Sequence, residues 1–347
     1  MKLRIEDIAK MANVSKATVS LALNDKPGIS NDTREKVLNI AKEAGYFSRP
    51  APKPDSSYPP TKKVIEFVAC VNSGIVVEQY QNRPFFTELI HYIQEHLRSK
   101  EYSILFSSVR NDQFYEEMER VVKNNASDGM IVLGTNLTYE QLKYVAELQP
   151  NLVVLDTCFE TLNVNFVDMN NVYGAYCAAQ YLIEQGHRDI GYVQADSRIY
   201  NFDMRKKGFL QALEEHGLML SEENCFSMSA NTITSQDKFK EQVLKQRDKL
   251  PTALFCECDY LAISTIKSLS ELDIHVPAEI SVIGFDNITE SQIISPELTT
   301  IHVDKEKMAS VAVDQLIQII EGKAGSRSKT LIDTELVERA SCTSPLR

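Results

Sequence analysis

The sequence predicts a small all-α head of three helices, joined by a linker to an α/β body of two doubly wound parallel-sheet lobes. Three observations predict it. Apolar residues show helical spacing up to residue 47, five of the twelve prolines fall within residues 48–63, and from residue 64 onward short apolar strands alternate with amphipathic helices. With 347 residues, of which 43% are hydrophobic, the chain can bury the cores of two or three folded units.

Charge is divided unevenly between the two parts. Residues 1–63 carry 12 Lys and Arg against 7 Asp and Glu, whereas the remainder carries 25 against 41. This predicts a basic module for nucleic acid, tethered to an acidic body that phosphates repel. The seven cysteines lack the even spacing of a disulfide framework, and no signal peptide or long apolar run occurs. We therefore expect a cytoplasmic protein with no membrane partner.

Three short amphipathic segments make up the head, residues 1–47. Their apolar stripes are Ile5, Ile8, Ala9 and Ala12, then Val19, Ala22 and Leu23, then Val37, Ile40, Ala41 and Ala44. Ser15 is placed to cap the second helix, and Ser30 or Asp32 the third. Two short helices joined by a tight turn and braced by a third predict a helix-turn-helix module, whose second helix enters the DNA major groove.

The outward face of the second helix decides between DNA binding and a merely structural three-helix cap. Lys16 suits guanine O6 or N7, and Ala17 and Leu21 suit the thymine methyl group. Short polar and cationic side chains near the helix ends suit phosphates. The expected DNA-binding residues are Ser15, Lys16, Ala17, Thr18, Ser20, Leu21, Asn24, Lys26 and Arg34.

Two head segments, "DIAKMANVSKATVSLALN" and "ISNDTREKVLNIAKEAGY", closely resemble the DNA-binding head of the lactose/galactose repressor (LacI/GalR) family in spacing and residue type. The resemblance implies a transcriptional regulator, in most members a repressor, that acts as a homodimer on double-stranded operator DNA. Two-fold geometry then implies a roughly palindromic operator with half-sites about one helical turn apart.

Eight apolar segments of the body predict strands. They are residues 64–71, 102–109, 129–133 and 151–156 in the first lobe, and 189–195, 225–229, 252–258 and 280–286 in the second. Amphipathic stretches between them predict helices at residues 85–99, 115–124, 172–186, 203–216, 236–248 and 260–273. The first four strands are expected to be buried. Ligands of such sheets bind at the carboxyl ends of the strands.

The body also resembles the core of the same family, in segments such as "PFFTELIHYIQEHLRSKEYSILF" and "AEISVIGFDNITESQIISPELTTIHVD". That resemblance implies a periplasmic-binding-protein-like core with a small effector, a sugar or sugar derivative, in the cleft between the lobes. The chain is expected to cross between lobes near residues 163, 294 and 330. The first lobe of the core (64–347) would then hold about 64–162 and 295–329, and the second 163–294 and 330–347.

Matches to the family pattern and strand-end positions single out the effector-binding residues. Phe86, more than Phe85, is expected to stack on the effector, Arg205 to be its polar anchor, and Asp286 to accept from hydroxyls. Two alternatives remain open: Arg205 in a surface ion pair, and Asp168 holding Arg205 in place. The expected set is Phe85, Phe86, Asp168, Asn201, Arg205, Asp259 and Asp286.

Cys258 and Asp259 stand where the family usually has an Asn-Asp pair, so the usual sugar is either replaced by another ligand or bound without that amide. No phosphate-binding glycine loop, dinucleotide fingerprint, zinc-protease motif or serine-hydrolase motif occurs. We expect no enzyme activity, no cofactor and no metal site. The alternative function is a solute-binding protein of sugar transport, which would share the body but lack the basic head.

The proline-rich linker, residues 48–63, departs from the family pattern. Most members have a short hinge helix here that wedges a leucine into the DNA minor groove. This stretch contains no leucine, and its five prolines disfavour a helix. We therefore expect an extended spacer, little kinking of the minor groove, and looser coupling between core and head than is usual for the family.

Overall fold

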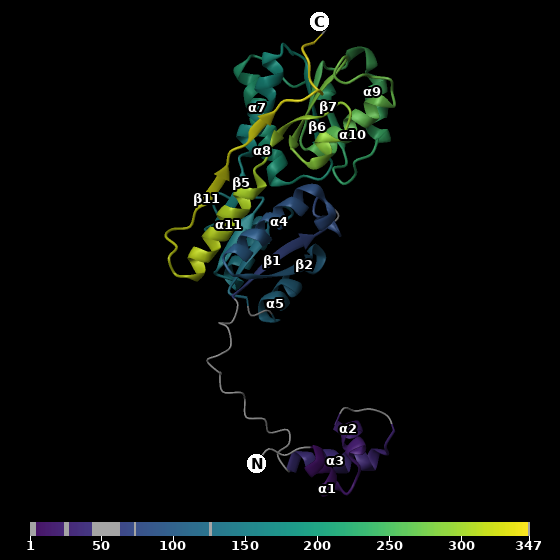
Figure 1. The fold of residues 1–347 in the computed structure, drawn as a ribbon. Coiled ribbons are helices and arrows are strands. Elements are labelled where there is room, and N and C mark those ends of the chain that lie inside the picture. Colours follow the sequence, from purple (N-terminus) through teal and green to yellow (C-terminus); the bar gives the residue numbers. More distant parts are fainter. Residues whose placement is uncertain (1–4, 24–27, 44–62, 73, 125–126, 346–347) are drawn as a thin grey trace. The chain divides into compact units, whose positions relative to one another are not determined.

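The computed structural model describes residues 5–23, 28–43, 63–72, 74–124 and 127–345. It divides into two units, Met1–Thr61 and Lys62–Arg347, which correspond to the head and the core (Figure 1). The linker expected over residues 48–63 lies outside the described residues except for Lys63.

Three helices form the head: α1 (Ile5–Ala12), α2 (Lys16–Leu23) and α3 (Asn31–Glu43). Both predicted caps are made by serines. The Ser15 hydroxyl accepts a hydrogen bond from the Thr18 backbone N–H (3.1 Å), and the Ser30 hydroxyl accepts one from that of Thr33 (3.3 Å). These bonds satisfy N–H groups that the first helical turn leaves unpaired.

The head has its own small apolar core, formed by Ile8, Ala9, Ala12, Val19, Ala22, Val37 and Ala41. Leu23 and Ile40 are partly buried against it. The expected burial of Ile5 is wrong, because this first residue of α1 is 36% exposed. Ala44 lies outside the described residues. Helical spacing therefore identified the inward faces, with an error at the first turn of the head.

The first lobe of the core is a parallel sheet covered by helices on both faces. Its strands are β1 (Val64–Val71), β2 (Ser103–Arg110), β3 (Gly129–Leu133), β4 (Leu152–Leu155), β5 (Asn165–Met169) and β11 (Lys329–Ile332). Its helices are α4 (Pro84–Ser99), α5 (Phe114–Asn124), α6 (Tyr139–Leu148) and α11 (Lys305–Ile320). Alternate residues of β1 serve the two faces: Phe67 packs with the α4 and α11 side, and Val68 with the α5 and α6 side.

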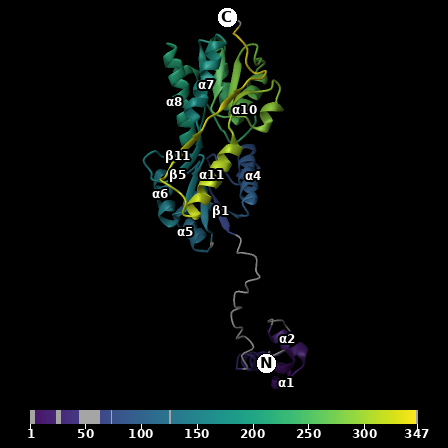
Figure 2. The same ribbon diagram turned by 60° about the vertical axis from the view of Figure 1, so that its left-hand side comes forward.

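The second lobe repeats this architecture. Its strands are β6 (Ile190–Ala195), β7 (Cys225–Met228), β8 (Ala253–Cys256), β9 (Ser281–Asp286), β10 (Thr299–His302) and β12 (Glu335–Val337). Its helices are α7 (Asn171–Glu184), α8 (Tyr200–Glu215), α9 (Asp237–Lys245) and α10 (Asp259–Ser270). Single-turn 3-10 helices occur at Tyr80–Asn82, Asn111–Gln113, Glu222–Asn224, Arg247–Lys249 and Thr289–Gln292. Figure 2 shows α7 and α8 on one side of this sheet and α10 on the other.

The two sheets have equivalent strand orders, β11-β5-β4-β3-β1-β2 and β12-β10-β9-β8-β6-β7. All described pairings are parallel except that of β12 with β10. β2 is an edge strand, so the expectation that it is buried is wrong in part: Leu105 and Phe106 are 39% and 42% exposed. The doubly wound architecture is as predicted.

The chain crosses between the lobes three times, but later than expected. β5 still belongs to the first sheet, β10 to the second, and β11 to the first, so the crossings follow Met169, His302 and Ile332. The expected crossings near 163, 294 and 330 lie too early, because the short strands β5, β10 and β11 continue their sheets past these positions.

Close packing of α7 on α8 positions part of the cleft. A Cβ at Gly208 would lie 2.0 Å from the Val172 carbonyl oxygen, so only glycine permits this approach. Gly208 is three residues after Arg205 and lies on the same side of α8. The helix contact therefore sets how far Arg205 reaches toward the cleft.

We predict that Gly208→Ala lowers the free energy of unfolding by about 1–3 kcal/mol, because α8 must move away from the α7 backbone. Urea denaturation monitored by circular dichroism measures this. The matched control is Gly325→Ala, where an added Cβ meets no atom within 4 Å. Equal stabilities for the two variants would contradict the prediction.

Candidate functional site

The first candidate site is the outward face of α2 in the head. Ser15, Lys16 and Ala17 are exposed, while Thr18, Ser20 and Leu21 are partly buried along the same helix. Lys16 Nζ lies 2.6 Å from Glu6 Oε1, and both side chains are more than half exposed. Such a surface pair is weak, so Lys16 can leave it for an acceptor on DNA at little cost.

Three other predicted DNA-binding residues are placed differently or not at all. Arg34 is partly buried on α3, and its Nη1 donates a hydrogen bond to the Leu21 carbonyl oxygen (3.4 Å). This bond braces the end of α2. Asn24 and Lys26 lie outside the described residues.

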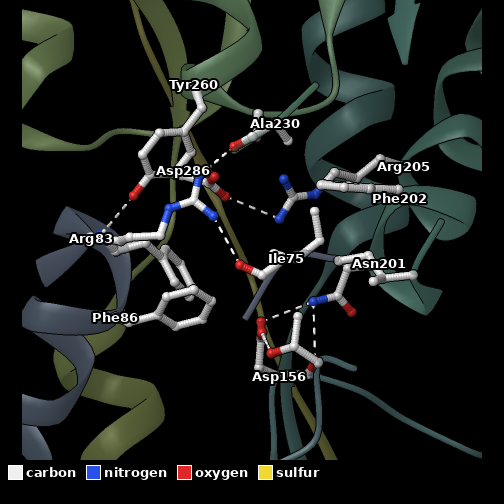
Figure 3. Close-up of a pocket in the computed structure, with 14 residues that line it drawn as sticks. Ile75, Arg83, Phe86, Asp156, Asn201, Phe202, Arg205, Ala230, Tyr260 and Asp286 are labelled. Carbon is white, nitrogen blue, oxygen red and sulfur yellow. Dashed lines mark hydrogen bonds and ion pairs between the residues drawn. The ribbon is translucent and has the colours of Figure 1, made fainter. Parts of the chain in front are cut away.

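The second candidate site is a cleft between the two lobes of the core (Figure 3). Five of the seven predicted effector-binding residues line it. The lining consists of Ile75, Arg83, Phe85, Phe86, Thr135, Asp156, Ile199, Asn201, Phe202, Arg205, Ala230, Cys258, Tyr260 and Asp286. The two predicted residues that do not line it are Asp168 and Asp259.

Arg205 and Asp286 form a buried ion pair at the cleft wall. Arg205 Nη2 lies 3.0 Å from Asp286 Oδ1, and the two side chains are only 4% and 8% exposed. The Arg205 guanidinium also lies over the Phe285 ring, 3.8 Å from its centroid. Burial raises the pKa of Asp286, while the charge of Arg205 opposes that shift. The surface ion pair considered for Arg205 is thus excluded.

Two further nitrogens of Arg205, Nε and Nη1, donate to acceptors of the second lobe. Its Nε donates to Asn171 Oδ1 (2.9 Å), and its Nη1 donates to the Glu257 carbonyl oxygen (2.5 Å). Asn171 in turn donates to Asp168 Oδ2 (3.3 Å). Asp168 therefore holds Arg205 in place indirectly, through Asn171, rather than by the direct contact that the alternative role implied.

Asp259 likewise supports the cleft without facing it. Its Oδ2 accepts from the Ile288 backbone N–H (2.9 Å), and its Oδ1 accepts from the Thr300 hydroxyl (2.5 Å). The side chain is fully buried. Asp259 thus ties the loop after β9 to β10, and it is not among the residues that line the cleft.

A second polar cluster joins the two lobes across the cleft. Asn201 Nδ2, on α8, donates to Asp156 Oδ1 (2.9 Å) at the end of β4, and the Thr135 hydroxyl donates to Asp156 Oδ2. Burial raises the pKa of Asp156 to about 7, although the Thr135 hydrogen bond and the Arg205 charge lower it. Asn201 Oδ1 is buried and has no hydrogen-bond partner among the described residues.

Arg83, immediately before α4, reaches from the first lobe to the second. Its Nη1 donates to the Ile75 carbonyl oxygen (2.8 Å) and to Asn231 Oδ1 (3.2 Å), and its Nη2 donates to the Ala230 carbonyl oxygen. The guanidinium stacks 4.5 Å from the Tyr260 ring centroid. Figure 3 shows it near the centre of the cleft.

Aromatic rings form the flat walls of the cleft. Phe85 and Phe86 both line it and meet edge to face, with centroids 5.4 Å apart, so the preference for Phe86 alone is too narrow. The enclosed volume is about 40 Å³, far less than the several hundred Å³ typical of a ligand pocket. Binding of a sugar-sized ligand therefore requires Arg83 to move or the lobes to separate.

Several lining residues were missed, although a signal existed for some. Thr135 and Asp156 lie just beyond the carboxyl ends of β3 and β4, where ligands of parallel sheets bind. Cys258, which stands where the family usually has an amide, lies just beyond β8 in the same way. Arg83 precedes a helix and carries no such positional signal. Its role emerges only because the second lobe supplies acceptors 147 and 148 residues away.

Comparisons with known proteins match both units. The profile of "Bacterial regulatory proteins, lacI family" matches residues 4–48, and that of "Periplasmic binding protein-like domain" matches residues 179–342. The chain is 31% identical over 347 residues to HTH-type transcriptional repressor PurR of Pasteurella multocida, covering 99% of both chains. It is 30% identical over 350 residues to HTH-type transcriptional regulator MalR of Clostridium butyricum, covering 98% of this chain and 99% of that one.

Solved structures share the fold. The transcriptional regulator CelR–cellobiose complex superimposes with a TM-score of 0.70 at 22% identity, covering 98% of this chain and 99% of that one. The Lac repressor dimer bound to operator and the anti-inducer ONPF gives 0.69 at 21% identity, covering 99% and 100%. A LacI family transcriptional regulator from Enterococcus faecium with bound ribose gives 0.67 at 21%, covering 81% and 99%.

We predict that Asp156 makes stability fall as pH rises. The pKa of Asp156 in the folded protein, about 7, exceeds the ordinary 3.8. The protonated carboxyl therefore contributes fully to the free energy of unfolding below about pH 4, and this contribution is lost as pH rises through 7. The Tm of the parent should therefore drop relative to that of Asp156→Asn between about pH 4 and 7, by an amount equivalent to a few kcal/mol.

Differential scanning calorimetry across this pH range measures the effect. Asp112→Asn is the control, because that side chain is 73% exposed and should leave the pH dependence unchanged. Parallel Tm curves for the parent and Asp156→Asn would show that the Asp156 carboxyl does not titrate in this range.

Proposed function

The chain belongs to the lacI family of bacterial regulatory proteins and is a DNA-binding transcriptional repressor with an effector-binding core, and from this premise we propose that a sugar or sugar-like effector in the cleft controls its hold on operator DNA. The membership replaces the alternative of a solute-binding protein of sugar transport. It also places the protein among regulators rather than enzymes, and in the cytoplasm with the chromosome on which it acts.

The buried pair of Arg205 and Asp286 at the cleft wall is the observation that carries the effector proposal. Charged groups held at strand ends beside aromatic faces suit a ligand with hydroxyls and a flat ring surface. Phe86, Phe202 and Tyr260 supply such faces. We assign effector contacts to Phe85, Phe86, Asn201, Arg205 and Asp286, with Asp156 and Thr135 added. Two solved structures of the same fold contain the sugars cellobiose and ribose, which supports a sugar as the class of effector.

DNA recognition is assigned to the exposed start of α2. Lys16 and Ala17 would read base edges in the major groove, and Ser15 and Thr18 would contact phosphates near the helix N-terminus. Leu21 and Ser20 extend this face along the helix. Arg34 is better assigned to bracing α2, since its guanidinium already bonds the Leu21 carbonyl.

We assign a homodimer as the working form, in keeping with the Lac repressor relative, which is a dimer on its operator. Two heads related by two-fold symmetry require a roughly palindromic operator. Closure of the cleft around the effector would shift one lobe against the other about the three crossings, and through the linker change the spacing of the heads.

Among the described residues, none of the helices combines the length and the apolar character that crossing a membrane requires.

We predict a steep salt dependence of DNA binding. Log affinity should fall with log salt with a slope of about −0.9 for each phosphate contacted, several in all. Lys16→Ala should reduce the preference for operator over random DNA by about 1–3 kcal/mol. Fluorescence anisotropy with DNA selected from a random library measures both quantities.

Lys245→Ala is the charge-matched control, because this exposed lysine lies on α9 of the core. It should leave both the salt slope and the operator preference unchanged. A flat salt response, or equal losses for the two lysine variants, would argue against the assigned DNA-binding face.

We predict that a cleft ligand stabilises the protein and alters operator binding. In a thermal-shift screen of sugars, sugar phosphates and purines, a true effector at 100 times its Kd stabilises by about 2.7 kcal/mol. Arg205→Ala should abolish the effect of that ligand on operator affinity while operator binding itself remains. Arg205→Lys, which keeps the charge but loses the fork, is the second variant in case removal of the charge unfolds the lobe.

If purines alone raise the Tm and no sugar does, the effector belongs to a class other than sugars. If the ligand changes the operator affinity of Arg205→Ala and Arg205→Lys as much as that of the parent, Arg205 is not the polar anchor of the effector.

A further inference from the structure

The two arginines of the cleft differ in what neutralises them. Arg205 is paired with the carboxylate of Asp286, and its other donors are taken by Asn171 and the Glu257 carbonyl. It is 3% exposed. The charge of Arg205 is therefore already balanced within the protein.

Arg83 has no such counter-charge. Each of its hydrogen-bond acceptors, the Ile75 and Ala230 carbonyl oxygens and Asn231 Oδ1, is neutral. No carboxylate of the described residues lies within ion-pair distance of its guanidinium. Its field reaches Asp286, whose pKa it helps to lower, but that carboxylate is already committed to Arg205. The cleft therefore contains one cation that the surrounding protein leaves unbalanced.

The position of Arg83 makes this charge available to a ligand. The side chain is only partly buried, it lies over the Tyr260 ring, and its guanidinium stands between the two lobes (Figure 3). A guanidinium fork matches the paired oxygens of a phosphate or carboxylate better than it matches single carbonyl oxygens. An entering oxyanion would replace the Ala230 and Ile75 carbonyls as its acceptor.

The opposite side of the cleft offers acceptors rather than donors. Asn201 Oδ1 is buried and has no hydrogen-bond partner among the described residues, and the Asp286 carboxylate, which is paired with Arg205, has lone pairs left to accept further hydrogen bonds. Buried oxygens in this condition are costly unless a donor reaches them. Hydroxyl groups of a ligand are donors of the right kind, and Phe86 and Phe202 flank them with apolar surface.

We propose that the effector is a hydroxylated anion, a sugar carrying a phosphate or carboxylate group, and that Arg83 binds the anionic group while Asn201 and Asp286 accept from its hydroxyls. This proposal rests on the function proposed above and narrows the class of ligand. A neutral sugar would satisfy the acceptors but would leave the charge of Arg83 without a partner inside the closed cleft.

Binding to the full chain should follow the charge of the ligand. The probes are glucose 6-phosphate, glucuronate, glucose and inorganic phosphate, at matched ionic strength, with affinity measured by calorimetric titration and by thermal shift. At least one anionic probe should bind tenfold or more tightly than glucose, since charge-assisted bonds are the stronger ones. The phosphate and carboxylate arms identify which oxyanion the site takes.

Arg83→Gln keeps the length of the side chain and can still donate to a carbonyl, but it loses the charge. It should reduce the anionic preference, which is the ratio of the Kd of glucose to the Kd of the anion, to threefold or less. Arg83→Lys should restore part of the preference. The matched control is Arg98→Gln at the other end of α4, where the side chain is 79% exposed and pairs with Glu95; it should retain the full preference.

Three results would overturn the proposal: glucose binding as tightly as every anion, no binding by any anion, or an undiminished preference in Arg83→Gln. Operator binding, measured in the same samples, separates this failure from that of the proposed function. If a neutral sugar changes operator affinity and no anion does, only the assignment of Arg83 fails. If no ligand of either kind changes operator affinity in the wider screen, the effector function itself fails.

Discussion

The ion pair of Arg205 and Asp286 is the interaction on which the cleft depends. It draws together α8 and the end of β9, and through Asn171 and the Glu257 carbonyl it also fixes the start of α7 and the end of β8. Taking both charges out of water is expensive, and the pair is stabilised because each guanidinium nitrogen of Arg205 has an acceptor. Loss of either partner would leave an unpaired charge inside the lobe. The second lobe can thus present a rigid polar wall, while the contacts that close the cleft come from Arg83 and Asp156 across the gap.

Sequence patterns were sufficient for the regular elements and for part of the site. Alternation of apolar strands with amphipathic helices identified both sheets, because the central strands of each sheet are buried on both faces. Position at a strand end predicts Asp286, and would have predicted Asp156, both of which line the cleft, but the same rule also selects Asp168 and Asp259, which do not line it. The difference lies in the backbone. Asp156 and Asp286 have positive φ values of 64° and 114°, which turn their side chains, whereas Asp259 begins α10 and points back into its own lobe.

The positions of the lobe crossings and the presence of Arg83 in the cleft were harder to predict, because both depend on partners that are distant in the sequence. β11 and β12 are short and partly exposed, so their membership of a sheet depends on pairing with β5 and β10 rather than on an apolar run. Arg83 depends in the same way on partners supplied by the other lobe. Neither local composition nor periodicity encodes which distant backbone will be adjacent, and both features therefore required the folded structure.

The late position of β11 and β12 in the chain also governs the order of folding during synthesis. The head buries its own core with residues near the N-terminus and can fold while the ribosome is still translating the body. Neither sheet of the body can be completed until residues 329–337 have been made, because β11 closes the edge of one and β12 the edge of the other. A nascent chain can therefore present a folded DNA-reading head before it has a finished sensor. Regulation by an effector begins only once the ribosome has released the final strands.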